Sequence, residues 1–212
     1  MNSGAVAKGL RTGEIALAVL GISLLGWSLA AVVNARVYQA RQGRAFSDLE
    51  GRAAAVRPSV SFPEALAARR PTPVSDADPL VLGRIEIPRI GVSAIVREGA
   101  DESTLAVAVG HVPGTARPGE RGNMALAGHR DSFFRALRKI RVRDTIQIRT
   151  AGGRYDYRVD TTEIVAPGDT RVLDSTGEPV LTLVTCYPFG FLGHAPDRFV
   201  VRASRLSPPG TP

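Results

Sequence analysis

The sequence predicts a mainly β domain that is preceded by one membrane-spanning helix. Three observations lead to this prediction: an uncharged apolar run near the N-terminus, a succession of short strand-like segments in the second half, and glycine- or proline-bearing turns between them. Many short strands with little helix are typical of a closed β-barrel or a β-sandwich. With 212 residues, the chain has room for one domain of ordinary size and an appendage.

The apolar run covers residues 15–33 and contains no charged residue. As a helix, its 19 residues would extend over about 28 Å, which is close to the hydrocarbon thickness of a bilayer. A cleaved signal peptide is the alternative, because the small residues at 28–30 would suit a cleavage site, but the run is long for such a peptide. We therefore predict an uncleaved anchor at 15–33 behind a polar head at 1–14.

Residues 34–78 are predicted to form a stalk between the anchor and the domain. Alanine, arginine and serine dominate this stretch, and four prolines lie in its second half. The part at 36–55 can prolong the helix, but no sustained apolar stripe predicts that it joins a core. The Pro-rich tail at 207–212 is predicted to be loose.

The folded domain is expected over residues 79–206. Its predicted strands are 82–90 with a bend at Pro88, 92–96, 123–130, 145–149, 154–165, 181–185 and 198–203. Alternating apolar and polar residues indicate that the first strand is half-buried, and Gly152-Gly153 indicates a hairpin.

Short helices and turns are expected between these strands. A helix at 101–109 can be capped by Asp101, and a helical turn at 132–139 would pack aromatic and aliphatic side chains inward. Those inward side chains are Phe133, Phe134 and Leu137. A third short helix is predicted at 169–173, and turns are predicted at 110–115 and 119–122.

The formal net charge of +7 is carried almost entirely by arginine. The arginines are scattered over the whole chain, and no sequence motif of a nucleic-acid-binding domain is present. We therefore expect no nucleic-acid partner, and attraction to an anionic membrane or envelope polymer explains the basicity more simply.

The chain has a single cysteine, Cys186, which cannot form an internal disulfide. It ends an apolar strand segment, because Tyr187-Pro188 follows directly and proline has no N–H for a sheet. After a loop with glycines and a proline, Arg198 opens the next strand. The thiolate is the reactive form of cysteine and needs a histidine or another cation beside it, whereas a buried cysteine without such a partner is an inert apolar residue.

Of the three histidines, His129 is the best partner for this thiol. It follows a second apolar strand segment, and Gly128 before it allows another backbone or a substrate to come close. Because 57 residues separate His129 from Cys186, only the fold can bring the two together. His111 lies in turn-like sequence and is expected to be structural, and His194 is expected to be solvated.

Three segments resemble the sortases, membrane-anchored cysteine transpeptidases that join proteins to the cell surface. They are Ala-Gly-His-Arg-Asp-Ser-Phe-Phe at 127–134, Thr-Leu-Val-Thr-Cys-Tyr-Pro-Phe at 182–189 and Ala-Pro-Asp-Arg-Phe-Val-Val-Arg at 195–202. The sequence is most similar to class D and its relatives, and the resemblance covers residues 80–206.

This resemblance implies an eight-stranded closed sortase-type β-barrel with a catalytic set of His129, Cys186 and Arg198. Cys186 would attack a carbonyl of a Leu-Pro-X-Thr-Gly-like sorting signal and form a thioester, which an amine would then resolve. Thr185 can support the substrate or the oxyanion, or serve packing alone, and Asp131 can orient His129 or merely share a face with it. No Cys, His or carboxylate cluster has metal-ligand spacing, so neither a metal nor another cofactor is expected.

The resemblance also implies partners and a location. The partners would be exported proteins with a C-terminal sorting signal and an amine acceptor, such as a peptidoglycan precursor or a pilin lysine. The head would lie inside and the catalytic domain outside the cell membrane. Basic residues after the anchor outnumber those before it, which by itself favours the reverse orientation. Those after it are Arg36, Arg41, Arg44 and Arg52, and those before it are Lys8 and Arg11.

Two alternatives belong to other classes of protein. An envelope cysteine hydrolase or L,D-transpeptidase would use the same thiol, but the latter family places its cysteine in a Ser-X-Gly-Cys setting that Thr-Leu-Val-Thr-Cys does not match. A membrane-tethered β-domain without catalysis would serve as a scaffold, and the complete set of cysteine, histidine and arginine argues against it.

Overall fold

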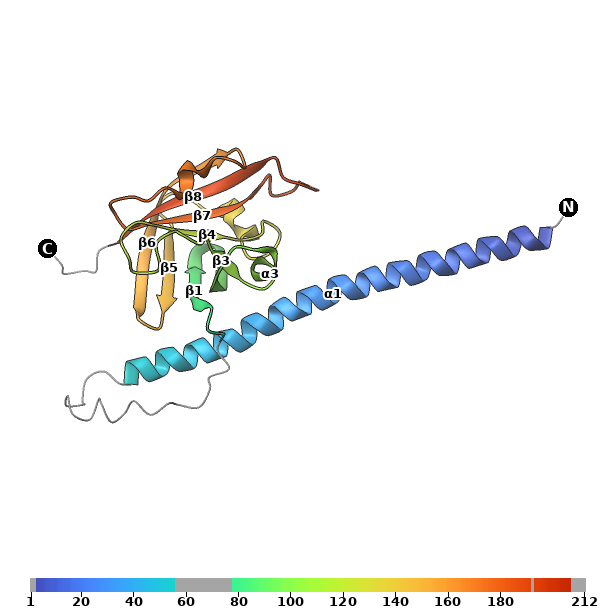
Figure 1. The fold of residues 1–212 in the computed structure, drawn as a ribbon, viewed down its shortest axis with the longest axis horizontal. Helices are drawn as coiled ribbons and strands as arrows, with labels where there is room; N and C mark the ends of the chain where they lie inside the picture. Colours follow the sequence, from blue (N-terminus) through green and yellow to red (C-terminus); the bar gives the residue numbers. More distant parts are fainter. Residues whose placement is uncertain (1–2, 56–77, 192, 207–212) are drawn as a thin grey trace.

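The computed structural model describes residues 3–55, 78–191 and 193–206, and it consists of a long helix followed by a β-barrel (Figure 1). Helix α1 (Ser3–Ala55) contains the predicted anchor and continues into the first part of the predicted stalk. Within it, Leu17–Gly51 is long enough to cross a membrane and contains an apolar stretch of 18 residues with a mean hydropathy of 1.9. The predicted rest of the stalk at 56–77 and the predicted tail at 207–212 lie outside the described residues.

Eight strands in the described part of the chain form a closed barrel, which confirms the predicted fold class. The strands are β1 (Val81–Ile87), β2 (Val92–Glu98), β3 (Val109–His111), β4 (Asn123–Ala127), β5 (Thr145–Thr150), β6 (Gly153–Val165), β7 (Val180–Tyr187) and β8 (Asp197–Arg205). Around the barrel their order is β1-β2-β3-β4-β7-β8-β6-β5. Side chains that alternate inward along the strands fill the interior; Ile85 and Ile87 of β1, for example, are fully buried.

Strand β3 was not predicted, because the sequence places Val109 at the end of the short helix at 101–109 and the next two residues in the turn at 110–115. It is three residues long and pairs in parallel with β2 and antiparallel with β4. So short a strand has no alternation of its own to reveal it, and only its two neighbours define it.

Four short helical segments connect the strands. They are η1 (Pro88–Ile90), α3 (Glu102–Leu105), η2 (Arg135–Lys139) and η3 (Thr170–Leu173). The predicted cap of α3 is confirmed, since the Asp101 carboxylate accepts a hydrogen bond of 3.1 Å from the Thr104 N–H. The helix is shorter than predicted because the chain already enters β3 at Val109. Before and within η2, Phe134 and Leu137 are fully buried, as the pattern predicts.

Beyond the apolar run, α1 packs against the barrel instead of standing apart from it (Figure 1). The Gln39 side chain donates to the Val107 carbonyl at 2.8 Å and accepts from the Ile95 N–H at 2.9 Å. Phe46 is buried with 4% of its surface exposed. The sequence did not predict this contact, because it depends largely on a glutamine that pairs with backbone groups. No apolar stripe on the helix indicates it.

Candidate active site

Two parallel strands bring the predicted nucleophile and the predicted proton carrier to the same end of the barrel. The register of β4 with β7 ends at Ala127 opposite Val184. The contact continues beyond the strand, since the Gly128 N–H donates to the Val184 carbonyl at 3.2 Å. His129 follows the end of β4 by two residues, and Cys186 lies two residues beyond Val184 on β7. Parallel pairing thus closes the gap of 57 residues between them.

Strand β8 brings the predicted arginine to the same place. It runs antiparallel to β7, with Arg198 directly opposite Cys186. Side chains directly opposite each other in an antiparallel pair project from the same face, with Cβ atoms about 5 Å apart. The Arg198 guanidinium donates to its neighbouring carbonyls, at 3.0 Å to Asp197 and 3.4 Å to Ala195. These contacts fold the side chain back along the β7–β8 connection.

Local packing determines where His129 lies. The Thr185 hydroxyl is buried and donates to the Gly128 carbonyl at 2.7 Å, which ties β7 to the residue before His129. A Cβ atom on Gly128 would lie 2.8 Å from the Phe134 ring, so only glycine lets this ring pack so closely. The Phe134 N–H in turn donates to the His129 carbonyl at 3.1 Å. The residue before the histidine and the turn after it are thus both held by buried groups.

The ring of His129 faces a carboxylate that sequence reasoning missed. Its Nε2 lies 3.8 Å from Oε1 of Glu102, which is 88% exposed, whereas the His129 side chain is 34% exposed. A pair so exposed is strongly screened by water and contributes little to stability. Among the described residues, Glu102 is the only carboxylate within 4 Å of this ring, so Asp131 does not orient it.

The short helix α3 carries Glu102 and is itself fixed by a charged cap. Hydrogen bonds from the Ser103 hydroxyl and then from the Thr104 N–H lower the pKa of Asp101 to about 2. The cap therefore stays ionised at neutral pH. Because Asp101 and Glu102 lie in a different part of the sequence from His129, no motif reveals the contact.

Arg130 is a second residue that sequence reasoning left without a role. Its guanidinium donates to the carbonyl groups of Pro188 at 3.2 Å, Phe191 at 2.8 Å and Gly193 at 2.8 Å. It also lies over the Phe191 ring, 5.9 Å from the centroid. The residue after His129 therefore holds the segment that follows Cys186.

The other histidines lie elsewhere. His111 is buried, and both of its ring nitrogens have partners: Nδ1 lies 3.1 Å from Glu98 Oε1, and Nε2 lies 3.0 Å from the Ala116 carbonyl. Both contacts agree with the structural role expected for His111. His194 is exposed, and Cys186 is half-buried with a free thiol.

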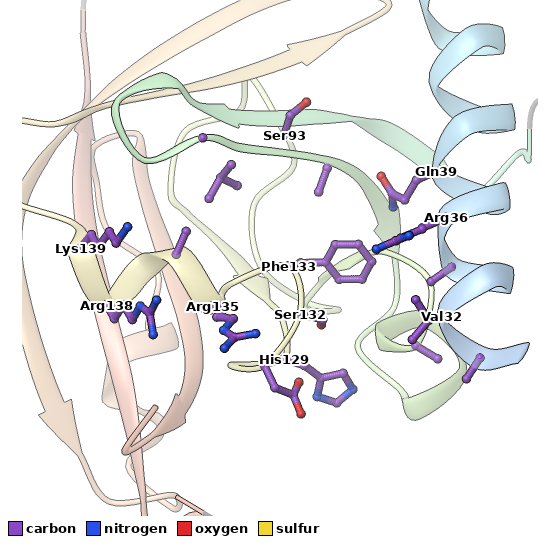
Figure 2. A pocket seen from close by; sticks show the side chains of 18 of the residues that line it. Val32, Arg36, Gln39, Ser93, His129, Ser132, Phe133, Arg135, Arg138 and Lys139 are labelled. Carbon is purple, nitrogen blue, oxygen red and sulfur yellow. The ribbon is translucent and has the colours of Figure 1, made fainter. Parts of the chain in front are cut away.

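A cavity of about 990 Å³ opens beside His129, between α1 and the barrel. Figure 2 shows His129 at its edge, with α1 on one side and η2 on the other. Cys186 is not among the lining residues. Of the three predicted catalytic residues, only His129 lines this cavity.

The side chains of Cys186, His129 and Arg198 are of the three types that acyl transfer requires. A thiol supplies the nucleophile, an imidazole carries a proton to or from an amine, and a guanidinium stabilises negative charge on an oxygen.

Comparison with known proteins supports this chemistry. Residues 85–206 match the model of the Sortase domain. The chain is 34% identical to Sortase D of Bacillus subtilis over 126 residues, which are 59% of this chain and 64% of that protein. It is 29% identical to Sortase A of Listeria monocytogenes over 110 residues, which are 50% of this chain and 49% of that protein. The matched regions thus span 64% and 49% of the length of these two curated relatives.

Solved structures agree in fold. A Sortase D5 transpeptidase of Clostridium perfringens superimposes with a TM-score of 0.59 at 28% identity, over 79% of this chain and 99% of that one. A lid mutant of Sortase A from Corynebacterium diphtheriae also gives 0.59, at 26% identity, over 81% and 96% of the two chains. Since the family model matches more than half of the sequence, the chain belongs to the sortase family.

Proposed function

We propose that this chain is a membrane-anchored cysteine transpeptidase in which His129, Cys186 and Arg198 carry the reaction. One observation supports the proposal: Arg198 is directly opposite Cys186 in the β7–β8 register, and the parallel register of β4 with β7 ends two residues before His129 and two residues before Cys186. Membership of the sortase family supports the same reaction class.

In the first half of the proposed reaction, the Cys186 sulfur attacks the carbonyl carbon of the scissile peptide bond. A carbon–sulfur bond forms, the carbon–nitrogen bond breaks, and His129 gives a proton to the departing amine. Arg198 donates hydrogen bonds to the oxygen on which negative charge develops. In the second half, an amine attacks the thioester and gives its proton to His129. A carbon–nitrogen bond forms, the carbon–sulfur bond breaks, and Cys186 leaves as the thiolate beside the protonated His129.

The proposed substrate is an exported protein with a C-terminal Leu-Pro-X-Thr-Gly-like signal. The proposed acceptor is an amine at the cell surface, from a peptidoglycan precursor or a pilin lysine. In this proposal, residues 15–33 cross the membrane, 1–14 remain in the cytoplasm, 34–78 link the two parts, and 79–206 form the external catalytic domain. Thr185 supports the site by fixing the residue before His129.

The test uses the full chain in lipid nanodiscs with a fluorescent Leu-Pro-X-Thr-Gly peptide and hydroxylamine as the amine. We expect a hydroxamate product and a thioester adduct on Cys186 by mass spectrometry. Cys186→Ala should give neither, and Arg198→Gln should lower kcat/KM by about a hundredfold, the usual effect of removing one oxyanion donor. Equal turnover by the Cys186→Ala chain would refute the proposal.

Matched controls separate catalysis from general damage. His194→Ala removes an exposed histidine outside the set and is compared with His129→Ala. Arg202→Gln is compared with Arg198→Gln. It removes a half-buried arginine of β8 that lies opposite Thr182 of β7. Release of a free acid in the presence of excess amine would indicate a hydrolase instead. Failure of iodoacetamide to label Cys186 at neutral pH would indicate a scaffold.

A further inference from the structure

The cavity between α1 and the barrel has a feature that acyl transfer does not use. Its wall on one side is α1, from Ala31 to Gln39, and its opposite wall includes η2 (Figure 2). The floor is partly apolar, with Val32, Phe133 and Ala136 among the lining residues. The cavity is therefore amphipathic and directly continuous with the end of the apolar run of α1.

Four cations line this cavity. They are Arg36 from α1 and Arg135, Arg138 and Lys139 from η2, and all four side chains are exposed. Within the described part of the chain, none of these side chains forms a hydrogen bond or an ion pair. In a 3₁₀-helix, side chains three residues apart project in the same direction, so Arg135 and Arg138 lie on one side of η2.

The positive charge of the cavity is not balanced by its own carboxylates. Glu102 and Asp131 also line it, which leaves an excess of two cations over anions when His129 is neutral. Glu102 is already close to His129. An anion that enters the cavity thus meets guanidinium groups whose hydrogen-bond donors have no partner among residues 3–55, 78–191 and 193–206.

The depth of the cavity along α1 matches the headgroup layer of a bilayer. The uncharged run ends at Val33, and Arg36 follows about 4.5 Å further along the helix axis. If 15–33 span the hydrocarbon, Val32 lies at its boundary and Arg36 lies among the lipid headgroups. Basic side chains at this depth are attracted to anionic phospholipids.

We propose that this cavity binds the headgroup phosphate of an anionic phospholipid from the membrane that α1 crosses. Arg36 and Arg135, which faces α1 in Figure 2, hold the phosphate from opposite walls, since guanidinium groups bind phosphate oxygens in pairs. Val32 and Phe133 contact the glycerol end of the acyl chains. The bound lipid holds the barrel with its His129 end against the membrane surface. This inference depends on the proposed anchor and not on acyl transfer.

The experiment uses the full chain with Cys186→Ala, so its outcome is independent of catalysis. The protein is placed in nanodiscs of equimolar phosphatidylglycerol and phosphatidylcholine and ejected for native mass spectrometry. We expect phosphatidylglycerol to be retained preferentially. Arg36→Gln and Arg135→Gln should each lower that preference about fivefold, which corresponds to about 1 kcal/mol per basic side chain at an anionic surface.

Arg154→Gln and Arg158→Gln, each made singly, are the charge-matched controls. Both arginines are exposed on β6, which contributes no residue to the cavity. Retention of both lipids to the same extent by the unsubstituted chain would overturn the proposal, and so would an equal loss of preference in the two controls. Soluble glycerol 3-phosphate is added in a separate measurement, and its retention to the same extent as phosphatidylglycerol would also overturn the proposal. So would the ejection of a dimer that carries no lipid. Unchanged amide exchange at Ile95 shows that each variant keeps α1 docked.

Discussion

At the scale of single residues, one hydroxyl connects the two strands that bear the predicted catalytic pair. The Thr185 hydroxyl satisfies the Gly128 carbonyl at 2.7 Å in a site where only 2% of Thr185 is exposed. Sequence reasoning left open whether Thr185 supports substrate or serves packing. The hydrogen bond indicates a positioning role that acts on His129 through its neighbour.

We expect Thr185→Val to lower kcat/KM about tenfold, because a buried carbonyl that loses its donor costs about 1–3 kcal/mol and the backbone before His129 shifts to find another. Thr182→Val is the matched control, since the Thr182 hydroxyl is equally buried and donates to Asn123 Oδ1 at 2.7 Å. Both variants should lower the Tm, and only Thr185→Val should affect turnover. Equal kinetic effects would show that Thr185 acts through general stability.

At the scale of elements, the site depends on a clamp between two connections. The turn after β4 carries His129 and Arg130, and the connection after β7 supplies the three carbonyl groups that Arg130 binds. Such a fork of several donors is specific to arginine, because lysine presents a single compact charge. The proposed histidine and the wall beside the proposed nucleophile are therefore positioned by adjacent residues of one segment.

We expect Arg130→Ala to speed amide exchange at Gly190 and Phe191 and to raise the KM for the peptide more than it lowers kcat. Arg130→Lys should restore only part of the effect, since it cannot reach three carbonyl groups at once. Arg121→Ala is the control, because Arg121 holds the Gly177 carbonyl with two hydrogen bonds, of 3.2 and 3.0 Å, before β7. An unchanged KM in Arg130→Ala would show that the contacts of Arg130 do not contribute to substrate binding.

At the scale of the whole molecule, α1 is part of the folded unit as well as the proposed anchor. Gln39 satisfies the N–H of Ile95, which is fully buried, and the carbonyl of Val107. Glu50 lies 3.9 Å from Arg149 on β5, which extends the contact along the helix. The barrel is thus held at a defined angle to the helix instead of hanging on a free linker.

We expect Gln39→Leu to free this part of α1 from the barrel, because two partly buried backbone groups lose their partner, and such a loss costs up to about 1–3 kcal/mol for each group. Amide exchange at Ile95 in the full chain should become faster. Gln147→Leu makes the same change on β5, where the side chain is half-buried, and should leave Ile95 protected. Protection at Ile95 that survives Gln39→Leu would show that other contacts dock the helix.

The sequence by itself determined the apolar helix, most of the strands and the identity of the residues proposed for catalysis. These follow from local patterns: an uncharged run, alternation along strands, and motifs that surround a single cysteine and a histidine. The closed barrel followed from the resemblance to a family, because strand patterns alone leave barrel and sandwich open.

Only the tertiary structure decided the neighbours of those residues. Glu102 beside His129, Arg130 across the β7–β8 connection and Gln39 against Ile95 all join segments that are distant in the chain. Polar contacts of this kind have no periodicity, since one side chain with the right reach is enough to make them. They arise when the strands close into a barrel, and for that reason no local pattern reveals them.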